Sequence, residues 1–295
     1  MTTTTTPAYD ALTQTYQRLH RLGHLQSIAS WDQAANMPPR GNEARAAAMA
    51  EMSSLLHGMR TDAALAEQLR SAEQEPLDDL QRANLREIRR DWRSSNAVPE
   101  ALVRRRSMAQ SRCEHAWRQQ RPANDWSGFV ENFREMLAVG REEARLLADL
   151  TGLRPYDALM DQYEPGTTCA TVDRVFGEVR QWLPGLIRQV QEVQARHPVI
   201  EPVGPFSVQA QRQLCGEVMR VLGFDFERGR LDVSAHPFCG GVPEDVRMTT
   251  RFRDDEFLGS LMGTVHETGH GRYEQNLPRE LLGQPVAHAR SAALH

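Results

Sequence analysis

Lysine is missing from the sequence, and this absence excludes several kinds of catalytic and binding site. The chain has 295 residues and 35 basic side chains, all of them arginine. Without lysine there is no Schiff-base nucleophile and no P-loop lysine to hold nucleotide phosphates. We read the arginine-only composition as a base-composition bias of the source and attach no function to it.

Other signals that are weak or missing narrow the class of protein. A formal net charge of −4 is too mild to indicate a nucleic-acid or membrane-surface partner. The N-terminal stretch MTTTTTPAYD lacks the charged and apolar segments of a signal peptide, and no run approaches the ~18 apolar residues of a membrane span. Four cysteines are present, none in a C-x-x-C pair, which argues against a zinc ribbon or a redox motif. We therefore expect a cytoplasmic protein with reduced thiols.

Helical periodicity dominates the first three quarters of the chain. Apolar residues recur at intervals of three and four, which predicts amphipathic helices around 12–28, 129–147 and 172–190. Pro184 is expected to kink the last of these. The sequence thus predicts a helical body over 1–228, with a frayed tail at 1–7, and a partial catalytic core over 229–295.

A short region before the last helix alternates in the manner of β-strands. The stretches RLDVSA and VRMTTRF alternate apolar and polar residues, and HPFCGGVPED between them is rich in glycine and proline. We predict two short antiparallel strands joined by a loop, then a helix capped at Asp254 or Asp255. The fold class is therefore mainly α, with a small antiparallel β element directly before that helix.

The stretch GTVHETGHGRYEQNLP carries the pattern H-E-x-x-H, formed by His266, Glu267 and His270. Positions i and i+4 lie one turn apart on one face of a helix, so the two histidines can bind a single metal ion. The glutamate can then accept a proton from a water that the metal activates. This spacing predicts a zinc-dependent hydrolase site. The helix face expected to pack on the core is formed by Phe257, Leu261 and Val265.

A zinc site of this kind normally has a third protein ligand, which the pattern itself does not supply. The metzincin pattern is excluded, because it needs glycine and histidine where the chain has Tyr273 and Asn276. Glu274 lies on the same helix face as His266 but about 12 Å further along the helix axis, too far to share one ion. The other candidates in the chain are Glu280, His288 and His295.

Further blocks along the chain match one known group of peptidases. They are WDQAANMPP at 31–39, PYDALMDQYEPG at 155–166, GRLDVSAHPFCGG at 229–241, the D-x-R-x-T pattern at 245–249, and HETGHGRYEQNLP at 266–278. Together with the H-E-x-x-H pattern, these blocks resemble the carboxypeptidase Taq family of thermostable metallocarboxypeptidases. The matches run from about residue 31 to the last residue.

This resemblance implies a two-lobed helical zincin fold, commonly a homodimer, that removes C-terminal residues from peptides with zinc or cobalt. In that family the metal is bound by the two histidines of H-E-x-x-H and a downstream glutamate. The glutamate follows a histidine that matches His295, so the resemblance places the third ligand just after the last residue. It also implies that the C-terminal part of the family fold lies beyond this sequence.

Four residues upstream of the metal helix are candidates for substrate binding. His236, in the H-P-F block, either lines the substrate site or satisfies backbone groups of its own loop. Alternation places Asp245, Arg247 and Thr249 on one face of a strand. The Arg247 guanidinium can pair with Asp245 inside the sheet or with a substrate carboxylate.

The leading interpretation is a metallocarboxypeptidase with Glu267 as general base and a peptide as its substrate. The chain as given is then expected to be incomplete and weakly active. An alternative is a non-catalytic truncated helical protein, because two ligands alone hold zinc weakly. A third reading is a zinc aminopeptidase or endopeptidase, which differs in the peptide end that is trimmed.

Overall fold

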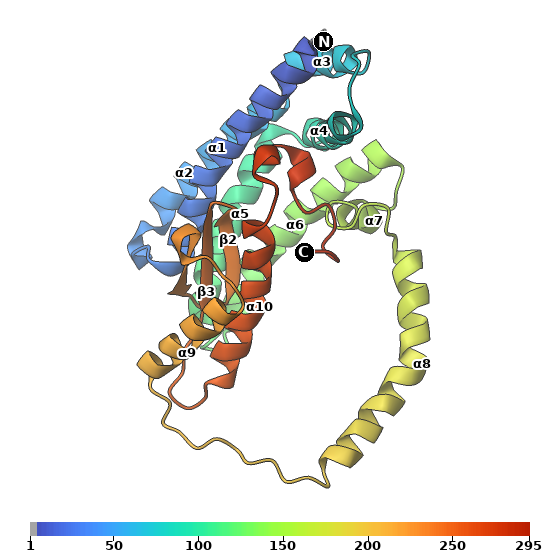
Figure 1. Ribbon diagram of the computed structural model, residues 1–295. Helices are drawn as coiled ribbons and strands as arrows, with labels where there is room; N and C mark the ends of the chain where they lie inside the picture. The colour runs from blue at the N-terminus through green and yellow to red at the C-terminus, as the bar shows by residue number, and fades with distance from the viewer. Residues whose placement is uncertain (1–4) are drawn as a thin grey trace.

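The computed structural model describes residues 5–295 and is mainly α-helical (Figure 1). Its helices are α1 Pro7–Ala35, α2 Asn42–Arg60, α3 Ala63–Ala72, α4 Asp79–Ala97, α5 Glu100–Gln120, α6 Trp126–Thr151, α7 Pro155–Met160, α8 Cys169–Gln194, α9 Val208–Val221 and α10 Leu258–Gln275. The strands are β1 Gly229–Val233, β2 Phe238–Val242 and β3 Asp245–Thr250. Short 3-10 turns lie at Pro39–Gly41, Phe226–Arg228, Arg279–Leu281 and Pro285–Ala287. The expected fold class is confirmed.

The predicted frayed tail, 1–7, falls partly outside the described residues. Pro7 is already in the first turn of α1, where proline loses no helical hydrogen bond. Thr6 is buried, and its hydroxyl donates to the Asp10 carboxylate at 3.3 Å. Thr6 and Pro7 therefore belong to the ordered helical body.

Two apolar cores hold the helical body together. The first joins α1, α2, α3 and α4 through Leu12, Tyr16, Leu56, Leu65 and Ile88, among others. The second joins α5, α6 and α7 through Leu102, Val139, Leu147 and Ala158, among others. These helices pack through the periodic apolar faces that the sequence displays.

Helix α8 has the predicted amphipathic pattern, but its apolar face is not covered. None of its residues is buried, and Phe176, Trp182 and Ile187 are 64%, 55% and 47% exposed. Pro184 lies inside the helix, as expected. Figure 1 shows α8 standing away from the other helices, joined to α9 by a long irregular segment. Periodicity thus predicted the helix correctly, while no described residue packs on its apolar side.

The β element differs from the prediction in strand number and direction. The order is β1-β3-β2, with β1 parallel to β3 and β2 antiparallel to β3. The two stretches predicted to pair as antiparallel strands therefore run parallel, and the predicted loop between them contains β2. This strand reverses the chain at Pro243–Glu244 and pairs Phe238 with Thr249 and Val242 with Asp245. Because β2 lies between β1 and β3 in the sequence and runs antiparallel to β3, β1 and β3 can run in the same direction.

Helix α9, assigned from the sequence to the helical body, packs with α10 and the sheet. A third apolar core joins Met219 of α9 and Phe224 to Val246 and Met248 of β3. The helix that carries the histidines thus rests on α9 and β3, so a packed unit begins about twenty residues before the expected boundary at 228.

Candidate metal centre

The two histidines of the H-E-x-x-H pattern meet on the open face of α10. His266 Nε2 and His270 Nε2 are 3.3 Å apart, and the two rings are inclined at 78°. A tetrahedral ion with metal–nitrogen bonds of about 2.0–2.1 Å separates two nitrogen ligands by about 3.3–3.4 Å. The observed spacing therefore fits two corners of such a site, so the histidine pair suits a zinc-type ion.

Glu267 lies between these histidines in sequence but is far less exposed. Its side chain is 8% exposed, while His266 is exposed and His270 is half-buried. Its carboxylate has no hydrogen-bond partner among residues 5–295. A buried carboxylate that no neighbour occupies is available to take a proton from a bound water.

Partial burial also affects the protonation of His270. Desolvation lowers the pKa of its imidazole, and the nearby His295 and His266 rings lower it further, while Glu267 acts in the opposite direction. A metal binds the neutral imidazole, so a lowered pKa keeps that form available near neutral pH.

The candidate third ligands lie at different distances from the histidine pair. The ring of His295 is 4.7 Å from that of His270 and 4.9 Å from that of Tyr273, and its Nε2 is 3.0 Å from Glu274 Oε1. Glu280 sits in an exposed turn, and His288 lies beside His20 of α1, with ring centroids 6.3 Å apart. Within residues 5–295, no group of three histidine, cysteine or acidic side chains is arranged to hold a metal ion.

The buried face of α10 is made of small and polar residues, contrary to the sequence prediction. The buried positions are Ser260, Thr264, Glu267, Thr268, Gly271 and Gln275. Phe257, Leu261 and Val265, which were predicted to face the core, are only half-buried. The helix begins at Leu258 after Phe257, so neither Asp254 nor Asp255 caps it; the Glu256 carboxylate accepts from Gly259 N instead.

The buried positions of α10 hold small residues because the helix lies close to its neighbours. Thr264 and Thr268 turn their hydroxyls back to carbonyls of their own helix, at 2.8 and 2.6 Å. Ser260 donates to Gln211 of α9 at 2.8 Å, and the Gln211 amide donates to two backbone carbonyls. Sequence reasoning missed these residues, although their spacing of four is the signal that marks them.

The H-P-F loop lies against the same helix. A Cβ placed on Gly263 of α10 would be 3.7 Å from Pro237 Cγ, an ordinary van der Waals contact, so the Pro237 side chain lies close to α10. His236 is exposed. Thr249 is fully buried, and its hydroxyl contacts the Ser234 hydroxyl at 2.7 Å and accepts from Phe238 N at 3.1 Å. Thr249 therefore supports the loop that carries His236.

Asp245 and Arg247 form a pair within β3 and contact α1. Arg247 donates to both carboxylate oxygens of Asp245, at 2.5 and 2.8 Å. His24 Nε2 is 3.5 Å from Asp245, and the Arg247 guanidinium stacks over Trp31 at 4.6 Å. The Arg247 pairing lowers the pKa of the Asp245 carboxyl. These contacts join the sheet to α1, which accounts for both charges without a ligand.

Cys239 lies on β2 facing the acidic side chains near α10. Burial, followed by the charges of Glu267 and Glu274, raises the pKa of its thiol to about 12. A protonated thiol is a poor metal ligand. Cys239 packs beside the third apolar core and is therefore a packing residue.

Comparison with known proteins identifies the family. The family model described as carboxypeptidase Taq (M32) metallopeptidase matches residues 11–295, which is nearly the whole chain. The chain belongs to this family. The resemblance inferred from the sequence blocks is therefore confirmed, and with it the assignment to a family of metallocarboxypeptidases.

Characterised relatives of this M32 chain support the same assignment. Thermostable carboxypeptidase 1 of Thermus thermophilus is 37% identical over 98% of the chain, and carboxypeptidase 1 of Bacillus subtilis is 28% identical over 95%. The solved structure of metallocarboxypeptidase 1 from Trypanosoma cruzi superposes on 97% of the chain with a TM-score of 0.86 and 45% identity.

The M32 chain spans just under three fifths of these relatives. It covers 59% of the Thermus thermophilus protein, 57% of the Bacillus subtilis protein and 58% of the Trypanosoma cruzi structure. A separate search of the described helices finds none that is long and apolar enough to cross a membrane.

Proposed function

We propose that this M32 chain carries part of the active site of a metallocarboxypeptidase, which removes C-terminal residues from peptides with a divalent ion. The observation that carries the proposal is the 3.3 Å spacing of His266 Nε2 and His270 Nε2 beside the buried Glu267. Zinc is the ion that this nitrogen pair favours, and cobalt accepts the same ligands. When bound, the ion supplies Lewis-acid activation of water and of the scissile carbonyl.

Each residue of the pattern has a separate role in this proposal. His266 and His270 hold the ion through Nε2. Glu267 takes a proton from the attacking water and passes it to the nitrogen of the leaving residue, and burial keeps its carboxylate free of competing solvent. The exposed His236, on the loop beside α10, binds the substrate near the scissile bond.

The third metal ligand is assigned from the family pattern. There a glutamate follows the histidine that matches His295. The ring of His295 already lies 4.7 Å from that of His270, so the next position in the chain is adjacent to the centre. Burial raises the pKa of Glu274, and the neighbouring His295 opposes part of this shift. Glu274 contacts His295 and so positions this segment instead of binding the ion.

Asp245, Arg247 and Thr249 take supporting roles in the proposed site. Arg247 is paired with Asp245 and stacked on Trp31, and Thr249 is buried under the H-P-F loop. We therefore expect them to set the position of β3 and of His236, and to affect substrate binding only through these elements.

The proposal extends to the setting in which the enzyme works. All four cysteines are free, as is usual for proteins of a reducing compartment, and this supports the proposal of a cytoplasmic location. The partner is a peptide substrate. A homodimer, which the family resemblance suggests, is tested by sedimentation of the purified protein.

The test replaces Glu267 in the polypeptide that the complete open reading frame encodes. Glu267→Gln should lower kcat for a blocked dipeptide by at least about 100-fold while the metal content stays the same. Glu280→Gln is the matched control, because Glu280 is an exposed glutamate outside the helix. Loss of metal in Glu267→Gln would contradict a general-base role.

The same assay separates the alternative functions. An N-terminally blocked peptide is cleaved by a carboxypeptidase and resists an aminopeptidase, and a peptide blocked at both ends is cleaved only by an endopeptidase. No hydrolysis of any of the three peptides, at full metal occupancy, would favour a non-catalytic helical protein.

A further inference from the structure

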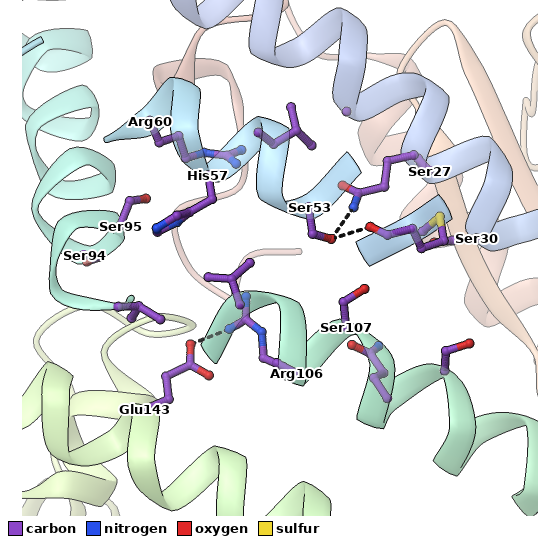
Figure 2. Close-up of a pocket in the computed structure, with 18 of the residues that line it drawn as sticks. Ser27, Ser30, Ser53, His57, Arg60, Ser94, Ser95, Arg106, Ser107 and Glu143 are labelled. Atoms are coloured by element: carbon purple, nitrogen blue, oxygen red, sulfur yellow. Dashed lines mark hydrogen bonds and ion pairs between the residues drawn. The ribbon is translucent and has the colours of Figure 1, made fainter. Parts of the chain in front are cut away.

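A second polar space lies among the N-terminal helices, away from α10. It is a cavity of about 590 Å³ between α1, α2, α4, α5 and α6 (Figure 2). Seven serines line it: Ser27, Ser30, Ser53, Ser94, Ser95, Ser107 and Ser111. We call it the serine cavity. So many hydroxyls from separate helices around one space are unusual for a helical interface, which apolar side chains normally fill.

Several of these hydroxyls have no protein partner. The Ser27 hydroxyl forms a hydrogen bond with the backbone of β2, and the Ser111 hydroxyl forms one with Gln33. The Ser53 hydroxyl is bonded to a nearby glutamine and to a nearby backbone carbonyl. In residues 5–295 the hydroxyls of Ser30, Ser94, Ser95 and Ser107 have none, so they can donate to and accept from a ligand.

A buried imidazole faces the same space. His57 of α2 is only 9% exposed, and its ring nitrogens have no hydrogen-bond partner in the part of the chain that the structure describes. Figure 2 shows its ring pointing into the space bordered by Ser95 and Arg106. A ligand in the cavity can therefore form hydrogen bonds with ring nitrogens that no described protein group occupies.

The charges of the cavity indicate a neutral ligand. Arg60 lies 3.3 Å from Asp91, Arg106 pairs with Glu143, and Glu114 pairs with Arg118. Burial lowers the pKa of His57, which favours its neutral form. With each charged side chain paired, the remaining groups are hydroxyls and an imidazole. Such groups suit an uncharged ligand that both donates and accepts hydrogen bonds, as a peptide backbone does.

The serine cavity adjoins a second cavity beside the metal helix. A second cavity of about 630 Å³ is lined by Cys239, Glu274 and His295. The two cavities share Gly23, Ser27, Arg60, Asp91, Ser94 and Gln162. His295 lines the second cavity and its ring is 4.7 Å from that of His270, so this cavity ends one side chain away from the histidine pair.

The dimensions fit several residues of an extended peptide. Along α1 the serine cavity is lined from Gly23 to Gln33, a distance of about 15 Å at 1.5 Å per helical residue. An extended chain advances about 3.3 Å per residue, so about four or five residues fit.

We propose that the serine cavity is a distal subsite that binds the backbone of the substrate residues well upstream of the scissile bond. It rests on the proposed carboxypeptidase function, because cleavage near the C-terminus leaves most of the peptide upstream of the scissile bond. Binding through serine hydroxyls and His57 reads the backbone and not the side chains. The enzyme then favours longer peptides over dipeptides, with little preference for upstream sequence.

The test compares a blocked heptapeptide with a blocked dipeptide that shares its last two residues, using the complete polypeptide. Ser107→Phe fills the cavity and should lower the ratio of the two kcat/KM values at least tenfold. Ser71→Phe is the matched control, because Ser71 is exposed on α3 and lines neither cavity. An unchanged ratio in a folded Ser107→Phe protein overturns the proposal.

A milder variant covers the case in which the phenylalanine prevents folding. Ser94→Ala together with Ser107→Ala removes two hydroxyls, and each lost hydrogen bond should cost about two- to tenfold in heptapeptide kcat/KM. No change in the length ratio for this variant overturns the proposal equally.

Binding without hydrolysis separates this proposal from the proposed function. A fluorescent heptapeptide is titrated into the Glu267→Gln protein with and without Ser107→Phe, and the Kd is read from anisotropy. A Kd raised by Ser107→Phe supports the subsite even if no form hydrolyses peptides. Normal hydrolysis with neither the length ratio nor the Kd altered refutes the subsite alone.

Discussion

Two glycines of α10 give a test of how this helix is held. A Cβ added to Gly271 would lie 2.8 Å from Phe224 Cε2 and 3.1 Å from Met248 Sδ. Phe224 is 5% exposed and Met248 is fully buried, so neither can move into solvent. A Cβ on Gly269, two residues earlier on the same helix, would meet nothing within 4 Å. Gly269 and Gly271 therefore differ in how closely they are packed, although both lie inside the same helix.

The expected energies follow from opposing terms. Replacing glycine by alanine inside a helix stabilises it by about 0.8–1 kcal/mol. Gly269→Ala should show this gain, because the added methyl is in open space. Gly271→Ala gains the same propensity but overpacks the core, which costs about 1–3 kcal/mol. The two variants should therefore differ by about 1–3 kcal/mol in their free energy of unfolding.

Thermal unfolding followed by far-ultraviolet circular dichroism measures this difference. At about 2–4 °C for each kcal/mol, Gly271→Ala should melt several degrees below Gly269→Ala. Adding Phe224→Leu to Gly271→Ala should cost less than Phe224→Leu alone, since the smaller side chain relieves the clash. Equal melting temperatures for the two alanine variants would refute the close packing of α10 on Phe224 and Met248.

Three further predictions concern the metal, acid stability and α8. Zinc added to the 295-residue chain should be lost on dialysis, since the proposed ligands within it are His266 and His270 alone, and stoichiometric zinc by atomic absorption would refute this. Hydrogen bonds from Arg154 and Cys169 N lower the pKa of Asp157 to about 2. This stabilisation is present above about pH 4 and is lost towards pH 2, so Asp157→Asn should flatten urea-measured stability across that window. The uncovered face of α8 should bind the dye ANS, and Trp182→Glu should weaken the fluorescence, whereas no dye binding would mean that the face is covered.

Local patterns in the sequence predicted the helices and the close approach of His266 and His270 on one helix face, because both depend on the 3.6-residue period. They failed where a distant contact decides the outcome. The glycines of HPFCGGVPED indicate a loop, yet β2 forms there because it pairs with β3 and because Ser27, far away on α1, bonds both Gly241 N and Gly241 O. The pattern of α8 was recognised correctly, but periodicity gives the direction of an apolar face and not its cover.

The buried face of α10 shows why the apolar prediction failed and how the failure relates to the site. Phe257, Leu261 and Val265 would have held the helix at a distance set by large side chains. Thr264, Thr268 and Gly271 instead let it approach β3 and Phe224, and Gly263 lets Pro237 lie against it. This close approach brings the exposed His236 loop to the turn before Glu267. The small residues therefore contribute to the proposed chemistry by setting a short distance. Alanine at Gly271, or a side chain larger than alanine at Gly263, should move the loop relative to the histidine pair without altering a proposed ligand.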